Sequence, residues 1–245
     1  MSLKKNARAS GYDHGFVIEQ NNATGGISFW ERSDNHSLAD RQGVSTADYI
    51  HAMYAFIRQA ESRHVLMVGC GGGTLATMLR RVGVKVTIVD IDGRNFEIAR
   101  AYFHMPEDVE CYVADGAAFL RRTSRKFDAI VLDAYCDNEI PKHMRTTRFL
   151  DLVKSRLKAR KAFVLVNLIA GDAQDCGPDR FAKLMQKTWR TVRLLDDEGR
   201  KSRNLIAVAG AVRALKKPRL LMRPKSGLKM LKRELGGLDF RPLRT

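Results

Sequence analysis

Aspartate side chains stand at or just after the ends of several short apolar segments in this 245-residue chain. These residues are Asp90, Asp92, Asp115, Asp133 and Asp137. Carboxylates gathered at one edge of a sheet repel one another, and holding them together is costly unless a cation joins them. A sulfonium ion or a protonated amine would meet that need. For a single aspartate such as Asp115, which precedes an expected helix, a helix N-cap is the alternative interpretation.

A glycine-rich turn precedes the first of these acids. The turn follows the apolar run 64–68 and contains Gly69, Gly71 and Gly73. Glycine can adopt positive φ angles and lets the backbone approach a ligand closely, and the helix that opens after the turn points free N–H groups into the same space. Asp90 lies about 20 residues beyond Gly69, the spacing at which a carboxylate binds a ribose. We therefore predict a nucleoside pocket.

The turn lacks the features that bind phosphate. Its glycines do not match the GxGxxG pattern of dinucleotide-binding folds, and Thr74 and Leu75 stand where a P-loop carries Lys and Ser or Thr. A nucleoside without phosphates, such as S-adenosylmethionine or its decarboxylated form, fits this combination. The alternative is an ordinary strand-to-helix turn without a ligand.

The elements that must position these residues alternate between strand and helix through most of the chain. Strands are predicted at 64–68, 86–89, 109–113, 127–132, 162–168, 192–195 and 205–212, and helices at 46–60, 95–103, 117–122, 147–157 and 179–189. This alternation requires a mostly parallel sheet with helices on both faces. The last two strands have no helix between them, which predicts one antiparallel edge strand.

The N-terminal residues predict a separate β element. Two short strands, 16–19 and 27–30, flank the turn sequence NNATGG and indicate a hairpin, with a third strand near 36–39. Such an element could lie over a cofactor pocket. We divide the chain into an N-terminal β element at 1–45, a cofactor-binding catalytic domain at 46–212 and a basic C-terminal tail at 213–245.

The net charge of +16 is unevenly distributed along the chain. Residues 213–245 hold eleven Lys or Arg residues against Glu234 and Asp239. A field of this sign favours anionic partners, including nucleic acid, but a solvated segment that promotes solubility explains the same composition. An expected helix near 228–235 could cover the flank of the domain or bind a partner. The sequence also leaves a homodimer open.

The cysteine and histidine patterns indicate the redox state of the compartment and whether the chain has a metal site. The four cysteines lie far apart without a CxxC pair, and the six histidines form no HxxxH or HxH group. These patterns indicate reduced cytosolic thiols and no metal site. No apolar run approaches the ~20 residues of a membrane span, and the first ten residues lack the apolar core of a signal peptide. We therefore expect a cytoplasmic protein without a membrane span.

Four segments resemble the spermidine synthase family of polyamine aminopropyltransferases, and more closely its divergent spermidine synthase-like branch. They lie within Tyr49–Leu168 and read VLMVGCGGGTL, TIVDID, VADGAAFL and FDAIVLDAYCDNEIPKHMRT. The resemblance implies an α/β fold with a Rossmann-like class I methyltransferase sheet and a small N-terminal β element. It also implies polyamine biosynthesis, in which a transferase moves an aminopropyl group from decarboxylated S-adenosylmethionine to an amine acceptor.

The resemblance implies roles for individual residues as well. Asp90 would bind the ribose hydroxyls and Asp115 the adenine amino group, while Asp133 would hold and help to deprotonate the attacking amine. The other cofactor-binding residues that we predict are Gly69, Gly71, Gly73, Asp92 and Gly116. Asp137 and Tyr135 complete the predicted catalytic set, and Tyr49 and His143 the acceptor pocket.

The chain departs from typical spermidine synthases in the glycine turn. Their loop reads GGGDGG, with an acid that contacts the aminopropyl nitrogen, whereas this position falls among the glycines of GCGGGT. A pocket without that acid can admit the carboxylate of intact S-adenosylmethionine, so a methyltransferase acting on a small molecule is the second hypothesis. A nucleic-acid-binding or RNA-modifying protein is the third, and a catalytically inactive scaffold is the fourth.

Overall fold

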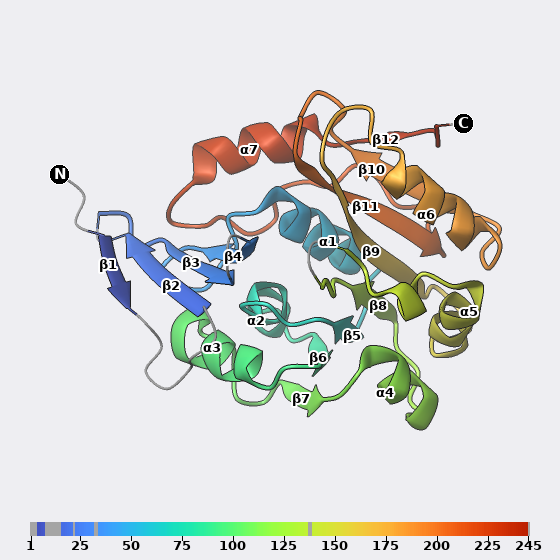
Figure 1. Cartoon of the computed structure of the whole chain (residues 1–245), viewed down its shortest axis with the longest axis horizontal. Coiled ribbons are helices and arrows are strands. Elements are labelled where there is room, and N and C mark those ends of the chain that lie inside the picture. Colours follow the sequence, from blue (N-terminus) through green and yellow to red (C-terminus); the bar gives the residue numbers. More distant parts are fainter. Residues whose placement is uncertain (1–3, 8–15, 22, 32–33, 137–138, 245) are drawn as a thin grey trace.

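Residues 4–7, 16–21, 23–31, 34–136 and 139–244 are described by the structure, a computed structural model. The N-terminal part is an antiparallel sheet whose strands follow sequence order: β1 (Lys4–Ala7), β2 (Phe16–Asn21), β3 (Ile27–Glu31) and β4 (Asp34–Ala39). β2 and β3 form the predicted hairpin, and β4 is the expected third strand. Figure 1 shows this sheet in blue, to one side of the main sheet.

In the described part of the chain, the main sheet has the strand order β12-β10-β11-β9-β8-β5-β6-β7. Its strands are β5 (His64–Val68), β6 (Lys85–Asp90), β7 (Glu110–Val113), β8 (Ala129–Leu132), β9 (Phe163–Ala170), β10 (Val192–Asp196), β11 (Arg203–Gly210) and β12 (Asp239–Arg241). β5 to β9 pair in parallel, which confirms the predicted mostly parallel sheet. The strand order reverses at β5, between β6 and β8. Ligands bind such sheets beyond the carboxyl ends of the strands at this switch point.

Helices cover both faces of the main sheet, as the alternation predicts (Figure 1). They are α1 (Asp48–Gln59), α2 (Thr74–Arg80), α3 (Arg94–Phe103), α4 (Gly116–Arg122), α5 (Thr147–Ser155), α6 (Gly177–Gln186) and α7 (Leu228–Gly237), with a 3-10 helix at Lys142–Met144. α1 and α7 bury Phe56 and Leu235 in one apolar cluster, and α5 and α6 bury Phe149 and Phe181 in the other. Within the described ranges, no helix has both the length and the apolar character of a bilayer-spanning segment.

A third apolar cluster joins the N-terminal sheet to the rest of the protein. Phe16 and Phe29 pack with Ile98 and Phe103 of α3, and the two phenylalanine rings of the sheet meet edge to face at 5.5 Å. Because α3 follows β6 directly, this packing holds the N-terminal sheet beside the carboxyl ends of the parallel strands. That is the place expected for a cover over a cofactor pocket.

Two strands of the main sheet run antiparallel to the others. β11 lies between β9 and β10 and is antiparallel to both, and β12 at the edge is antiparallel to β10. The antiparallel edge strand therefore comes from residues of the predicted basic tail, whereas the last strand that the sequence indicated, β11, lies inside the sheet. α7 comes from the same segment and buries Leu231 and Leu235.

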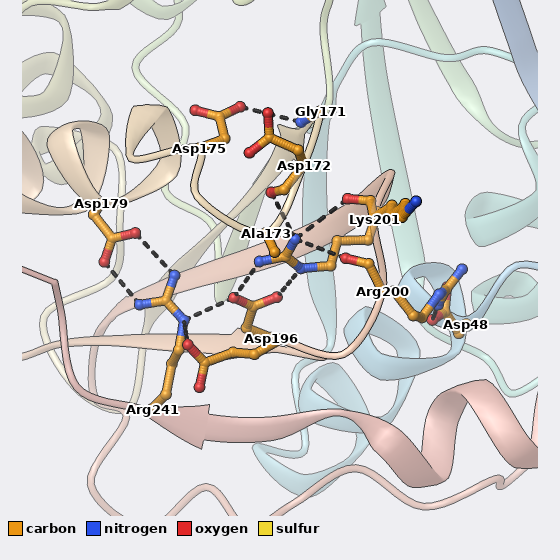
Figure 2. A network of polar contacts seen from close by, with 12 residues as sticks. Asp48, Gly171, Asp172, Ala173, Asp175, Asp179, Asp196, Arg200, Lys201 and Arg241 are labelled. Carbon is orange, nitrogen blue, oxygen red and sulfur yellow. Dashed lines mark hydrogen bonds and ion pairs between the residues drawn. The ribbon is translucent and has the colours of Figure 1, made fainter.

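Buried ion pairs hold β12 against its neighbours (Figure 2). The guanidinium of Arg241 donates to both carboxylate oxygens of Asp179, at 2.7 and 2.8 Å, and to Oδ2 of Asp196 at 2.7 Å. Arg203 donates to both oxygens of Asp196. Burial raises the pKa of the Asp196 carboxyl, but the two guanidinium groups outweigh burial and hold that pKa below its usual value. The network joins α6, β10, β11 and β12.

Replacing Arg241 with alanine is expected to lower the free energy of unfolding by about 3–5 kcal/mol, because Asp179 and Asp196 stay buried with fewer donors. Urea unfolding followed by circular dichroism measures the change. Arg219→Ala is the control, since Arg219 is exposed in the same C-terminal segment, and its effect should stay within roughly 0.5 kcal/mol. Equal effects of the two substitutions would contradict the role assigned to Arg241.

Candidate active site

The glycine turn is built around a close contact between two strand ends. Gly69, Gly71 and Gly73 have φ angles of +98°, +49° and +64°, a region that favours glycine. A side chain at position 69 would place its Cβ 2.1 Å from the carbonyl oxygen of Asp133. The N–H of Asp133 in turn donates to the carbonyl of Val68 at 2.8 Å. The ends of β5 and β8 can therefore meet in this way only when residue 69 is glycine.

Asp90 ties this turn to the end of β6. Its carboxylate accepts hydrogen bonds from the backbone N–H of Cys70 at 2.7 Å, from the N–H of Asp92 at 2.9 Å and from Nδ2 of Asn95 at 3.2 Å. Burial raises the pKa of the Asp90 carboxyl in spite of these donors. The contacts give Asp90 a role in holding the turn, and its contact with a ribose stays a prediction.

Two contacts link the loops after β5 and β6 to the N-terminal sheet. Asp92 is paired with Arg94, whose guanidinium lies 4.6 Å from the centre of the Phe16 ring. The N–H of Gly72 donates to Oγ of Ser37 at 2.8 Å, and a Cβ at position 72 would lie 2.8 Å from Cβ of Ser37. The fourth position of the turn, where typical synthases carry an acid, is therefore packed against Ser37 and has no room for a side chain.

Asp115 is the N-cap of α4, and its contact with the adenine amino group stays a prediction. Its Oδ1 accepts a hydrogen bond from the N–H of Ala118 at 2.8 Å, and its Oδ2 lies 2.8 Å from Nε2 of His143. A Cβ at Gly116 would lie 2.5 Å from Cγ1 of Val68. Asp115 and Gly116 thus hold α4 close to the end of β5. The structure brings His143, predicted in the acceptor pocket, next to a predicted cofactor residue.

Two exposed apolar side chains beside these acids escaped the sequence prediction. Ile91 directly follows β6 and is 77% exposed, and Val113 ends β7 and is 66% exposed. A Cβ at Gly93 would lie 3.0 Å from Cγ2 of Val113, so this side chain reaches the loop that carries Asp92. Apolar side chains near carboxylates suit the flat face of a nucleobase. The sequence feature that could have indicated this surface is Ile91, the apolar residue between the two acids of TIVDID.

Asp133 is the centre of a second group of site residues. Its Oδ1 accepts a hydrogen bond from Nδ2 of Asn167 at 2.8 Å, and Oδ1 of Asn167 accepts one from Nδ2 of Asn204 at 2.9 Å. The hydroxyl of Tyr135 donates to the backbone carbonyl of Asn167 at 2.6 Å. Both asparagines were missed in the sequence, although Asn167 interrupts the apolar run FVLVNLIA and a buried amide needs hydrogen-bond partners.

Poor solvation changes the acid–base properties of this group. Burial raises the pKa of the Asp133 carboxyl to about 6, and the hydrogen bond from Asn167 offsets part of the rise. Burial, reinforced by the charge of Asp133, also raises the phenol pKa of both Tyr49 and Tyr135 well above its usual value. The phenols therefore stay neutral at pH 7, whereas Asp133 changes its protonation state near neutral pH. Asp137, predicted to be catalytic, lies outside the described residues.

The two groups of residues offer complementary chemistry at one edge of the sheet. The turn after β5 and the loops after β6 and β7 provide glycines without side chains, carboxylates and apolar surface, all of which suit a nucleoside. The carboxyl at the end of β8 can accept a proton, because a general base is most effective when its pKa lies near the working pH. Gly69 joins the two groups through its contact with the backbone of Asp133.

Comparisons with known proteins agree with this geometry. A family model described as "Methyltransferase domain" matches residues 65–159. The probable polyamine aminopropyl transferase of Bifidobacterium longum is 31% identical over 135 residues, which cover 54% of this chain and 30% of that protein. The polyamine aminopropyltransferase of Chromobacterium violaceum is 31% identical over 131 residues, which cover 51% of this chain and 49% of that protein. Over about half of its length, the chain is similar in sequence to these polyamine aminopropyltransferases.

The chain spans less than half the length of these two polyamine aminopropyltransferases. A solved structure extends the likeness of fold to nearly the whole chain. The crystal structure of a probable spermidine synthase from Corynebacterium glutamicum superposes with a TM-score of 0.75 at 16% identity, and the match covers 98% of this chain and 91% of that chain. The predicted Rossmann-like methyltransferase sheet with a small N-terminal β element is confirmed.

Gly69→Ala is expected to destabilise the protein by more than about 4 kcal/mol, because the new Cβ would overlap the backbone of Asp133. Gly83→Ala is the matched control: its φ angle is +77°, yet nothing lies within 4 Å of an added Cβ. The control should lose only about 1–2 kcal/mol, the cost of a left-handed φ angle. Chemical denaturation measures both, and equal losses would show that the contact with Asp133 is not needed.

The carboxyl of Asp133 is expected to titrate near pH 6. Because this pKa is raised above its value in the unfolded chain, Asp133 contributes stability that is fully present below about pH 4 and is lost as the pH rises through about 6. ¹³C NMR of labelled aspartate carboxyls, assigned with Asp133→Asn, measures the pKa directly. The wild type should also lose stability relative to Asp133→Asn between these pH values. A titration near pH 4 would contradict the prediction.

Proposed function

We propose that this chain transfers an aminopropyl group from decarboxylated S-adenosylmethionine to a small-molecule amine. The observation that carries the proposal is the carboxyl of Asp133, which is poorly solvated, has a pKa of about 6 and lies beside Tyr49 and Tyr135. The relationship to polyamine aminopropyltransferases supports the same reaction. We further propose that the enzyme is cytoplasmic and works without a metal ion.

The residues beyond β5, β6 and β7 suit the nucleoside part of this donor. Gly69, Gly71 and Gly73 let the backbone approach it closely. Among the described residues, Oδ2 of Asp90 accepts one hydrogen bond, from the N–H of Cys70, so a lone pair of this oxygen remains for a ribose hydroxyl. Ile91 would pack on the adenine ring. The remaining predicted cofactor residues in this group are Asp92, Asp115 and Gly116, and the exposed Val113 would add apolar surface beside them. When bound, the sulfonium of the donor supplies an electrophilic carbon and a neutral thioether leaving group.

Asp133 would carry the proton chemistry of the reaction. An alkylammonium ion cannot attack until it loses a proton, and the carboxylate of Asp133 would orient the nitrogen and accept that proton. The nitrogen lone pair then forms the new C–N bond while the C–S bond breaks and its electron pair goes to sulfur. Tyr49 and Tyr135 stay protonated and would line the acceptor pocket as neutral hydroxyl groups. Asp137 would be the second acid for the acceptor.

A methyltransferase that uses intact S-adenosylmethionine is the second candidate function. The observation that favours it is Gly72, whose N–H binds Ser37 and whose position leaves no room for the acid of typical synthases. Without that acid, nothing at this position would repel the carboxylate of the intact cofactor. Isothermal titration calorimetry with the two cofactors separates the candidates, since a clear preference for intact S-adenosylmethionine would favour the methyltransferase.

A product assay tests the proposed reaction directly. The protein is incubated with decarboxylated S-adenosylmethionine and putrescine, spermidine or cadaverine, and mass spectrometry follows the addition of one aminopropyl unit to the amine. A parallel incubation with intact S-adenosylmethionine follows methylation. The proposal fails if no amine gains an aminopropyl unit, and a methylated amine in the parallel reaction would establish the second candidate instead.

Asp133→Asn is expected to lower kcat by roughly 10²-fold or more, because it removes the general base. Binding of the donor, measured by calorimetry, should stay within a few-fold of the wild type, since the glycine turn and Asp90 are unchanged. Asp108→Asn is the matched control, because Asp108 is an exposed carboxylate that pairs with Arg80 outside the site. Full activity of Asp133→Asn would refute the role of this residue.

A further inference from the structure

A line of hydrogen bonds crosses three neighbouring strands of the main sheet and ends at Asp133. Leu132, the last residue of β8, pairs with Val166 of β9, so the next residues along, Asp133 and Asn167, come side by side. Asn167 lies opposite Ile206 of β11, and Asn204 is its diagonal neighbour on the same face. The hydrogen bonds at 2.8 and 2.9 Å join Asp133, Asn167 and Asn204 in this order.

Asn167 lies where an apolar residue would be expected. It is 3% exposed, within a strand whose neighbouring side chains Val166 and Leu168 are buried in the apolar core. A buried amide costs stability unless its donors and acceptors are paired. Asn167 is paired on both sides, with Asp133 and with Asn204. A fully paired polar network inside a core holds its members in one arrangement.

The direction of the hydrogen bonds follows from the chemistry of the groups. An ionised carboxylate only accepts hydrogen bonds, so the NH₂ group of Asn167 must face Asp133 and its Oδ1 must face Asn204. Asn204 donates to that oxygen and thereby prevents the amide of Asn167 from turning over. Oδ1 of Asp133 is occupied by this arrangement. Among the residues that the structure describes, Oδ2 of Asp133 has no hydrogen-bond partner.

Other ionisable groups near Asp133 come from α1 and from the loop after β8. The phenols of Tyr49 and Tyr135 lie near enough for the charge of Asp133 to add to the effect of burial, which raises their pKa, and both stay neutral at pH 7. Asp48, next to Tyr49, is paired with Arg200 of the β10–β11 connection. In the described part of the site, the amide of Asn167 is therefore the group that donates directly to the carboxylate of Asp133.

We propose that Asn167, oriented by Asn204, is a positioning residue that holds Oδ1 of Asp133 and turns Oδ2 toward the acceptor amine. The identity of the acceptor as an amine rests on the proposed function, whereas the hydrogen bonds and their effect on Asp133 do not. Removing the donor should leave Asp133 harder to ionise, because burial then acts without an opposing hydrogen bond.

Asn167→Asp is the sharpest test, since it replaces only the NH₂ group by oxygen and keeps an acceptor for Asn204. The two neighbouring carboxyl groups should titrate as a pair whose upper apparent pKa exceeds that of Asp133 in the wild type. The acid limb of the pH profile of kcat/KM should move to higher pH. At pH 7, kcat/KM should fall by up to about 10²-fold, because the base is protonated and no longer held in place.

Two further variants separate this effect from loss of folding. Ile206→Val changes the core residue directly opposite Asn167 and should leave the pH profile unchanged. Asn204→Ala keeps Asn167 but removes its orienting donor, so it should shift the profile in the same direction by a smaller amount. If Asn167→Asp does not fold, Asn204→Ala carries the test.

¹³C NMR of the aspartate carboxyls in the full chain measures the titration of Asp133 directly, without any substrate. A raised titration in Asn167→Asp supports the proposal even if the wild type transfers nothing to any amine, an outcome that would overturn only the proposed function. An unchanged titration of Asp133 in folded Asn167→Asp and Asn204→Ala overturns the proposal, whatever the activity of the wild type.

Discussion

The contact between Gly69 and the backbone of Asp133 is the constraint on which the site depends. β5 is the strand at which the sheet order reverses, so the turn after it lies between the predicted nucleoside side at β6 and the proposed base, Asp133, after β8. Because residue 69 has no side chain, the turn can lie on the carbonyl of Asp133, while the next N–H donates to Asp90. One glycine thus sets the separation of the two halves of the site.

The sequence predicted those features of the fold and the candidate site that depend on residues close together in the chain. The glycine turn, the acids at strand ends and the mostly parallel sheet all depend on neighbours within a few residues. Asn167 and Asn204 depend instead on the register between β8, β9 and β11, which the sequence does not state. β12 escaped prediction for a related reason, since Asp239–Arg241 is short and is fixed by distant carboxylates rather than by a β-branched run.

The positive charge of the C-terminal segment is partly used inside the protein. Arg241 binds Asp179 and Asp196, and Arg244 binds Glu198. A count of basic residues treats both arginines as free, although their charge is already neutralised by neighbours. Recognition of nucleic acid requires cations gathered on one surface, so composition alone overstates the case for it. The lysines of α7 are exposed, but the same helix packs its apolar side chains against α1. The basic segment therefore has a structural role in covering the domain.

The base strength of Asp133 reflects two opposing effects that the fold sets separately. Burial alone would favour the protonated carboxyl, which cannot accept a proton from an amine. Several donors, as at Asp196, would hold the pKa so low that the carboxylate would be a weak base. In the described part of the site, Asp133 is poorly solvated and has one hydrogen-bond donor, Asn167, and its pKa is about 6. A single amide held by a neighbouring strand therefore leaves this carboxyl ionised at neutral pH and still basic enough to take a proton.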